Sequence, residues 1–143
     1  MYRDLGCFEE AKALSQEALI VNDSLILASA HNNIGVINRN LGLYDDALSI
    51  YIKSLSIYEA KGMKSQIATT HNAIGLVYNY NGIDDKAIGY HLKAKTSFEK
   101  LDNKKGISEV YNNFAIIYAN DGDLDKALDY FKYSLEIEES LDD

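Results

Sequence analysis

The side chains best suited to metal or acid–base chemistry in this sequence of 143 residues are its three histidines. His31 and His71 are forty residues apart, and both fall on the predicted inward face of a helix. No cysteine or acidic residue accompanies them at the spacing that a zinc site requires. We therefore interpret them as stacked core histidines and place His91 on a core row as well. The sequence predicts no metal site.

A second candidate for chemistry is the acidic run Asp121-Gly122-Asp123-Leu124-Asp125, which resembles the opening of a calcium loop. Lys126 stands where that loop needs glycine, and Lys132 stands where it needs a bidentate glutamate. The sequence also has no nucleophile elbow, phosphate loop or paired-carboxylate motif. We therefore predict that the chain is not an enzyme and that it has no cofactor.

The net charge of −8 is concentrated at one end of the chain. Residues 121–143 hold nine acids against two lysines, a net charge of −7, so the preceding residues are close to balance. No patch or stripe of Lys and Arg is available, which argues against nucleic acid and anionic membrane as partners. We interpret the acidic end as a solvated last helix. Cys7 is the only cysteine, so no intrachain disulfide can form.

The elements that must position any site are copies of one unit. The repeated signature reads His31-Asn32-Asn33-Ile34-Gly35, His71-Asn72-Ala73-Ile74-Gly75 and Tyr111-Asn112-Asn113-Phe114-Ala115. A partial copy around Leu5-Gly6 lies 36 residues ahead of Leu41-Gly42, about one helical turn short of forty. Self-similarity at a fixed spacing is typical of stacked-repeat proteins.

Each unit reads as two helices joined by a short turn. The chain has no proline, which favours long unbroken helices. Apolar residues at spacings of three and four predict helices over 8–21, 24–40, 44–61, 64–80, 84–101, 104–120 and 123–141. The predicted fold is all-α, an alpha-alpha superhelix (solenoid) of stacked antiparallel helical hairpins, with a right-handed twist. We expect one domain, 1–143, made of a partial repeat (1–23) and repeats at 24–62, 63–103 and 104–143.

Small residues recur where the helices of a hairpin should cross. Gly35, Gly75 and Ala115 share one position of the first helix, and Ala47, Ala87 and Ala127 share one position of the second. Close approach of two helices needs small side chains at the crossing point.

These residues resemble the tetratricopeptide repeat family. The middle unit supplies His71, Ile74-Gly75, Tyr78, Gly82, Ala87, His91 and Ala94. The departures are His for the usual first aromatic, Asp84 where an aromatic is expected, and no terminal proline. The forty-residue spacing is similar to that of a longer-helix subclass found in peptide-binding scaffolds, bacterial quorum-peptide receptors and bacterial sensor proteins. The resemblance implies a non-enzymatic domain that binds proteins or peptides on a concave surface lined by the first helix of each hairpin.

The candidate ligand surface is the arc of each first helix that faces away from the core. An apolar row (Val36, Leu76, Ile116) and an amide row (Asn32, Asn72, Asn112) run along it. Because an Asn side chain both donates and accepts hydrogen bonds, such a ladder can hold the backbone of an extended peptide. The alternative is that these asparagines cap the surface between helices or simply face water. The full predicted set is Asn32, Asn33, Val36, Arg39, Asn40, Thr69, Asn72, Leu76, Asn79, Tyr80, Glu109, Asn112, Asn113 and Ile116.

The predicted function is a protein- or peptide-binding module, part of a larger regulatory or signalling protein. The arc lacks the Lys/Arg cluster that would recognise a C-terminal carboxylate. We expect a cytoplasmic location, or a periplasmic one if the chain is a sensor segment of a bacterial protein. The alternative is a structural spacer or a self-association module that uses exposed terminal repeats. In that case the acidic last helix is a partial cap, whereas Leu14, Leu19, Ile20 and Val21 leave the first helix without one.

Overall fold

The computed structural model describes residues 6–14 and 23–142 of the chain. A helical segment at 6–14 is followed by six helices, and the described residues contain no strand. The helices are α2 (Ser24–Asn40), α3 (Tyr44–Ala60), α4 (Lys64–Tyr80), α5 (Asp84–Lys100), α6 (Lys104–Asn120) and α7 (Leu124–Leu141). The predicted all-α repeat fold is confirmed. The predicted helix over 8–21 extends beyond the described residues, as do Leu19, Ile20 and Val21.

The helix boundaries follow the repeat closely. The first helix of each hairpin, α2, α4 and α6, has the predicted bounds, and the second helices differ from prediction by one residue at one end. The turns between successive helices each contain one residue with a left-handed backbone. Four of these residues are glycines, and Asp102 (φ 52°) takes the fifth position. Asn103, which we expected to tolerate this conformation, instead caps α6 through a hydrogen bond from the Gly106 backbone N–H at 3.0 Å.

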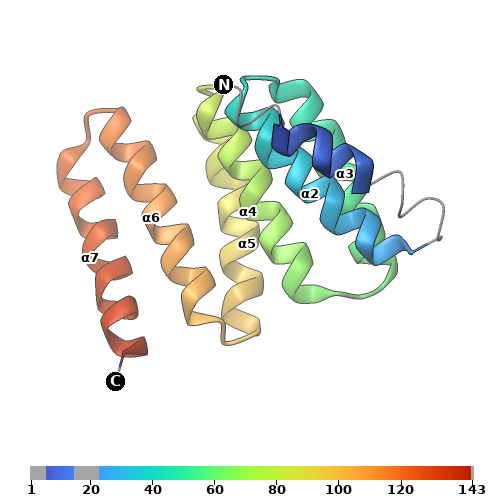
Figure 1. Ribbon diagram of the computed structural model, residues 1–143. Helices are drawn as coiled ribbons and strands as arrows, with labels where there is room; N and C mark the ends of the chain where they lie inside the picture. The colour runs from blue at the N-terminus through green and yellow to red at the C-terminus, as the bar shows by residue number, and fades with distance from the viewer. Residues whose placement is uncertain (1–5, 15–22, 143) are drawn as a thin grey trace.

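The hairpins α2/α3, α4/α5 and α6/α7 stand beside one another in sequence order (Figure 1). Among the described residues, α2 contacts α4 and α4 contacts α6, whereas α3, α5 and α7 do not contact one another. The first helices are therefore the inner helices of the stack, and the second helices are the outer ones. No helix within these residues is both long and apolar enough to cross a membrane.

In the hairpins α2/α3 and α4/α5, an aromatic ring of the outer helix packs against a glycine of the inner helix. The Tyr51 ring of α3 covers Gly35 of α2, and a Cβ added to Gly35 would lie 2.6 Å from the Tyr51 Cζ atom. The His91 ring of α5 covers Gly75 of α4 in the same way, with 2.7 Å to its Cε1 atom. Neither ring is exposed by more than 1%. The predicted small residues are needed because a buried ring occupies the space of a side chain.

The following hairpin completes the enclosure of each ring. Ile74 and Val77 of α4 pack in one buried cluster with Tyr51. Phe114 of α6 meets His91 edge to face, with 6.0 Å between ring centroids. Tyr51 of α3 and His91 of α5 therefore each join three helices from two hairpins.

A second crossing point in each hairpin is also made of small residues. The Ser54 hydroxyl of α3 donates to the Ala28 carbonyl of α2 at 3.0 Å. Ala68 and Ala94 are fully buried at the equivalent positions of α4 and α5. In the last hairpin Ser108 and Ser134 pair through their hydroxyls at 2.9 Å. The two helices of a hairpin thus approach closely at two levels.

Replacing Gly75 with alanine should destabilise the chain, because the new Cβ meets a ring that has no free space. Overpacking of this kind costs about 1–3 kcal/mol, while the better helix propensity of alanine returns about 1 kcal/mol. Gly89→Ala is the matched control: Gly89 is exposed in α5, and no atom lies within 4 Å of its added Cβ. Urea unfolding should show a lower free energy of unfolding for Gly75→Ala and a higher one for Gly89→Ala. Equal stabilisation of both variants would contradict the ring contact.

Candidate peptide-binding surface

The predicted surface residues divide into three groups by exposure. Eight are exposed: Asn33, Val36, Asn40, Thr69, Tyr80, Glu109, Asn112 and Ile116. Three are partly buried: Asn32, Arg39 and Leu76. Three are buried: Asn72, Asn79 and Asn113. We name the exposed and partly buried residues the inner strip, since all lie on the inner helices α2, α4 and α6.

The apolar row runs through the inner strip. Val36 is 38% exposed and Ile116 is 36% exposed, while Leu76 of the central hairpin is partly buried between them. The three residues occupy one position of the repeat on three successive inner helices. The structure therefore places an apolar row on the solvent side of the inner helices.

The predicted amide row does not form an exposed ladder. Asn112 faces solvent, but the Asn32 amide donates to the Tyr58 hydroxyl at 3.4 Å and Asn72 is only 8% exposed. The prediction that Asn72 faces solvent is wrong, and Asn79 and Asn113 are buried as well. These three amides are between 7% and 9% exposed, so they present little surface to a ligand.

Asn72 is instead the centre of a buried polar network that joins two hairpins. Its Oδ1 accepts a hydrogen bond from the Asn113 amide of α6 at 3.0 Å. The same oxygen lies 2.6 Å from Nδ1 of His91 on α5. Because an amide oxygen can only accept, Nδ1 of His91 carries the proton and donates it. Nε2 of His91 is then an unprotonated, buried atom without a partner.

The predicted exposure of the α4 asparagines was wrong because α4 has neighbouring helices on more than one side. It packs against α3 and α5 and also contacts α2 and α6. A helical wheel that assumes one buried face therefore predicts too many solvent-exposed residues on α4. The repeat-equivalent residues Asn33 and Asn113 show the effect directly: Asn113 is covered by α4, whereas no inner helix precedes α2 within the described residues and Asn33 is exposed.

The other two histidines are partly buried rather than stacked in a closed core. Burial lowers the pKa of His31, and the nearby Lys53 lowers it further. Burial is also the main cause of the lowered pKa of His71, aided by Lys93 and opposed by Glu59. Both pKa shifts favour the neutral side chain. No group of three or more His, Cys, Asp or Glu side chains within 6–14 and 23–142 is arranged to hold a metal ion.

One charged group lies across the inner strip. The Arg39 guanidinium of α2 lies over the Tyr80 ring of α4, 4.9 Å from its centroid. Its Nη2 also donates to the Asn40 side chain at 3.3 Å. Arg39 therefore links two hairpins, and its guanidinium packs against an aromatic ring. Because Arg39 is the one cationic residue of the inner strip, the strip offers little free positive charge to a ligand.

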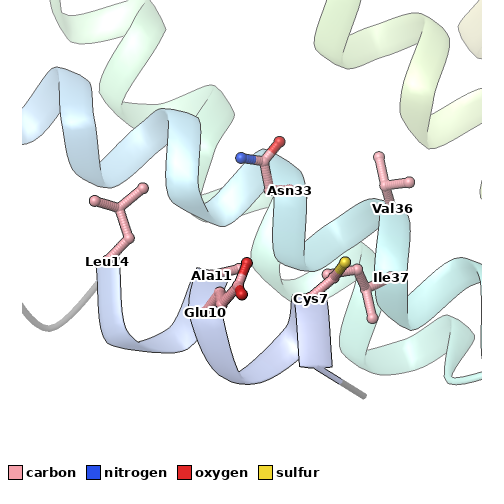
Figure 2. A pocket seen from close by; sticks show the side chains of 7 residues that line it. All are labelled: Cys7, Glu10, Ala11, Leu14, Asn33, Val36 and Ile37. Atoms are coloured by element: carbon pink, nitrogen blue, oxygen red, sulfur yellow. The ribbon is translucent and has the colours of Figure 1, made fainter. Parts of the chain in front are cut away.

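A hollow of about 410 Å³ opens beside the inner strip, between the helical segment 6–14 and α2 (Figure 2). The segment contributes Ala11 and Leu14 to its lining, and α2 contributes Val36 and Ile37. Cys7, Glu10 and Asn33 complete its lining. The hollow is largely apolar and continues the row that begins at Val36.

Sequence reasoning did not find this hollow, although one signal for it was present. The partial repeat around Leu5-Gly6 placed a helix ahead of α2, but the predicted ligand surface was drawn only on the first helix of each hairpin. The hollow forms because the segment 6–14 flanks α2 while no inner helix precedes α2 within the described residues. Asn33 and Val36 were in the predicted set, whereas Cys7, Glu10, Ala11, Leu14 and Ile37 were not.

The family model of the tetratricopeptide repeat matches residues 26–82 and 66–140, which together span most of the chain. The chain belongs to the tetratricopeptide repeat family. Tetratricopeptide repeats are typically interaction and scaffold modules and not enzymes, and they imply protein partners. A search of curated proteins gave no match.

Solved structures share the fold. The crystal structure of BtubC (BKLC) from P. vanneervenii superposes with a TM-score of 0.79 at 24% identity. That match covers 96% of this chain and 58% of BtubC. The crystal structure of MamA gives a TM-score of 0.66 at 26% identity, covering 97% of this chain and 73% of MamA. This tetratricopeptide repeat chain thus spans little more than half the length of BtubC.

The buried network predicts a pH-dependent stability. Burial lowers the pKa of His91 to about 4, from 6.5 in an unfolded chain. As the pH falls below 6.5, His91 takes up a proton in the unfolded state but not in the folded state. The contribution of neutral His91 to the free energy of unfolding is therefore fully present above pH 6.5 and is lost as the pH falls toward 4. The loss attributable to His91 is about 3 kcal/mol over this window.

Urea unfolding at several pH values checks this expectation. His91→Phe is the matched variant, because the equivalent position in α7 is Phe131 and a Phe ring cannot be protonated. His31 and His71 remain in both proteins, so the difference between the two pH profiles isolates His91. Parallel profiles would show that His91 is not buried in its neutral form.

Proposed function

We propose that this chain binds an extended peptide segment of a protein partner along the inner strip. The observation that supports the proposal most is the apolar row of Val36, Leu76 and Ile116, which stays accessible on three successive inner helices. A row at one repeated position offers evenly placed contacts to a ligand that crosses the hairpins. The peptide would run across α2, α4 and α6, not along any one of them.

The chemistry of the inner strip favours an apolar, weakly charged peptide. In an extended chain successive side chains point to opposite sides, so every second one can contact the apolar row. Asn33, Asn40 and Asn112 are exposed, and each amide can both donate to and accept from a peptide backbone. Glu109 is the exposed charge of the strip, since Arg39 lies against Tyr80. Recognition would therefore depend on apolar side chains and backbone groups.

The hollow beside α2 would receive one larger side chain of the same peptide. Its volume of about 410 Å³ exceeds the space that a single leucine or phenylalanine side chain fills. Leu14, Val36 and Ile37 supply apolar contacts to that side chain. Glu10, which also lines the hollow, favours a basic residue next to it in the peptide. This end of the strip would fix the register of the peptide. A larger regulatory or signalling protein is the context that we propose for the module.

A display library of random, unstructured peptides tests the proposal even while the natural partner is unidentified. The parent chain should enrich peptides with apolar residues at alternate positions. The double variant Val36→Asp, Ile116→Asp should lose them, because it places two carboxylates in the apolar row. Both residues are exposed, so circular dichroism should show an intact fold.

Ile52→Asp is the matched control for this experiment. Ile52 is an exposed residue of the outer helix α3, and the equivalent residue of α7 is Lys132, so the repeat accepts a charge there. The control should bind the enriched peptides as the parent does. Binding that survives in the double variant, or that is lost equally in the control, would rule out the inner strip as the binding surface.

A further inference from the structure

A second hollow lies at one end of the central hairpin, where α4 begins and α5 ends. Its volume is about 300 Å³. Lys64 and Ile67 of α4 line it, together with Ser97, Lys100 and the C-cap residue Leu101 of α5. We name it the α4/α5 hollow. None of its residues belongs to the inner strip, so the hollow is separate from the surface that we propose for peptide binding.

The polar side chains of the α4/α5 hollow have no partner in the described part of the chain. The ammonium groups of Lys64 and Lys100 form no ion pair there, and the Ser97 hydroxyl forms no hydrogen bond. An ammonium group has three N–H donors and no acceptor, and a hydroxyl can add one more donor. The side chains of the hollow therefore present mainly donors, which suit a ligand that is an acceptor.

The nearby acids do not neutralise the two lysines. None of the five lining residues is acidic. Glu99, which precedes Lys100, forms an ion pair with Lys95 at 3.0 Å. Asp102, in the turn after α5, forms no ion pair with a described residue. The α4/α5 hollow thus keeps two unpaired positive charges in a chain whose net charge is −8.

Two other hollows of the chain have different charges. The hollow beside α2 has Glu10 as its charged lining residue. A third hollow, of about 210 Å³, is lined by both Lys105 and Glu109, whose charges are opposite. Neither of them has an excess of positive charge, so an anionic ligand is favoured at the α4/α5 hollow and not at these two.

The pair of lysines is specific to the central hairpin and is not a property of the repeat. The equivalent residues are Ser24, Leu27, Ile57, Ala60 and Lys61 in the hairpin α2/α3, and Lys104, Ile107, Ile137, Ser140 and Leu141 in the hairpin α6/α7. Each of these sets contains one lysine. Moreover, the central hairpin has a hairpin on each side, so the accessibility of the α4/α5 hollow does not arise from an open end of the stack.

The lining also has an apolar part. Ile67 is partly buried and Leu101 is 40% exposed, so an apolar group in the hollow would remove their side chains from water. The volume is at the lower end of the range of small-molecule sites, about 300–1,000 Å³. A carboxylate attached to that apolar group would accept charge-assisted hydrogen bonds from the ammonium groups, and such bonds are stronger than those between neutral groups.

We propose that the α4/α5 hollow binds a carboxylate that carries a compact apolar group. The apolar group lies against Ile67 and Leu101, and the carboxylate accepts hydrogen bonds from Lys64 and Lys100. Such a ligand has two sources: a free organic acid, or an acidic side chain next to an apolar one in a partner protein. The site does not depend on peptide binding at the inner strip, because the two share no residue.

The probe for this proposal is 4-phenylbutyrate, titrated at pH 7 into the chain with labelled isoleucine and leucine methyl groups. The methyl signals of Ile67 and Leu101 should shift in a saturable manner, with a Kd below about 1 mM. The neutral amide, 4-phenylbutyramide, has the same apolar body and should bind at least about tenfold more weakly. Added salt should also weaken the binding of the acid.

Variants of the two lysines make the test specific. Lys64→Gln and Lys100→Gln should each weaken the binding about tenfold, because each removes one charged donor. Lys104→Gln is the matched control: Lys104 begins α6 as Lys64 begins α4, and it does not line the hollow. The control should bind as the parent does. All three lysines are exposed, so circular dichroism should show an intact fold.

A short peptide distinguishes the two sources of the ligand. Acetyl-Gly-Phe-Glu-Gly-amide places a carboxylate beside an aromatic side chain and has no terminal charge. Tighter binding of this peptide than of 4-phenylbutyrate would assign the site to a segment of a partner protein. Tighter binding of 4-phenylbutyrate would assign it to a free organic acid.

Three results would overturn the proposal. The first is the absence of methyl shifts at Ile67 and Leu101 with both the acid and the peptide up to about 1 mM, the range of weak recognition. The second is equal binding of the acid and its amide, or an equal loss in the Lys104→Gln control, since either would show that the two lysines do not recognise a carboxylate. The third is a set of shifts at Val36 and Ile116 instead, which would place the ligand on the inner strip.

Discussion

The structure depends on one repeated contact, in which a ring of an outer helix lies on a glycine of its inner partner. Tyr51 on Gly35 and His91 on Gly75 set the distance between the two helices of a hairpin, because no side chain fits between them. The next hairpin then closes over the same ring with Ile74 or Phe114. Packing within a hairpin and packing between hairpins are therefore not independent, since both meet at one buried side chain.

This contact also determines which surfaces remain for binding. Because the rings point into the stack, the inner helices keep only a narrow strip of accessible residues, and the central helix loses Asn72 and Asn79 to its neighbours. At α7 no helix within the described residues follows, so Phe131 and three leucines stay exposed. At α2 no inner helix precedes within those residues, so a hollow opens beside Val36. The same repeat thus presents a shallow strip in its middle and more apolar surfaces toward its ends.

Most of the fold could be predicted from the sequence, because the forty-residue period, the turn glycines and the small residues all specify the same hairpin. The candidate site could be predicted only in part. Val36 and Ile116 are exposed as expected, whereas Asn72 is buried, because a helical wheel considers one helix and cannot include contacts to its neighbours. The charge of α7 suggested a solvated helix, whereas its acids lie beside exposed apolar residues. Asn113 is buried and Asn33 is exposed because they lie at different places in the stack, although their local sequences are similar.

The most direct test of binding at the inner strip is a crystal structure of the chain in complex with a peptide enriched from the display library. We expect an extended peptide that crosses α2, α4 and α6, with apolar side chains on Val36, Leu76 and Ile116 and one larger side chain in the hollow beside Leu14. A peptide bound to the outer helices α3 and α5, or one that avoids the apolar row of the inner helices, would contradict binding at the inner strip.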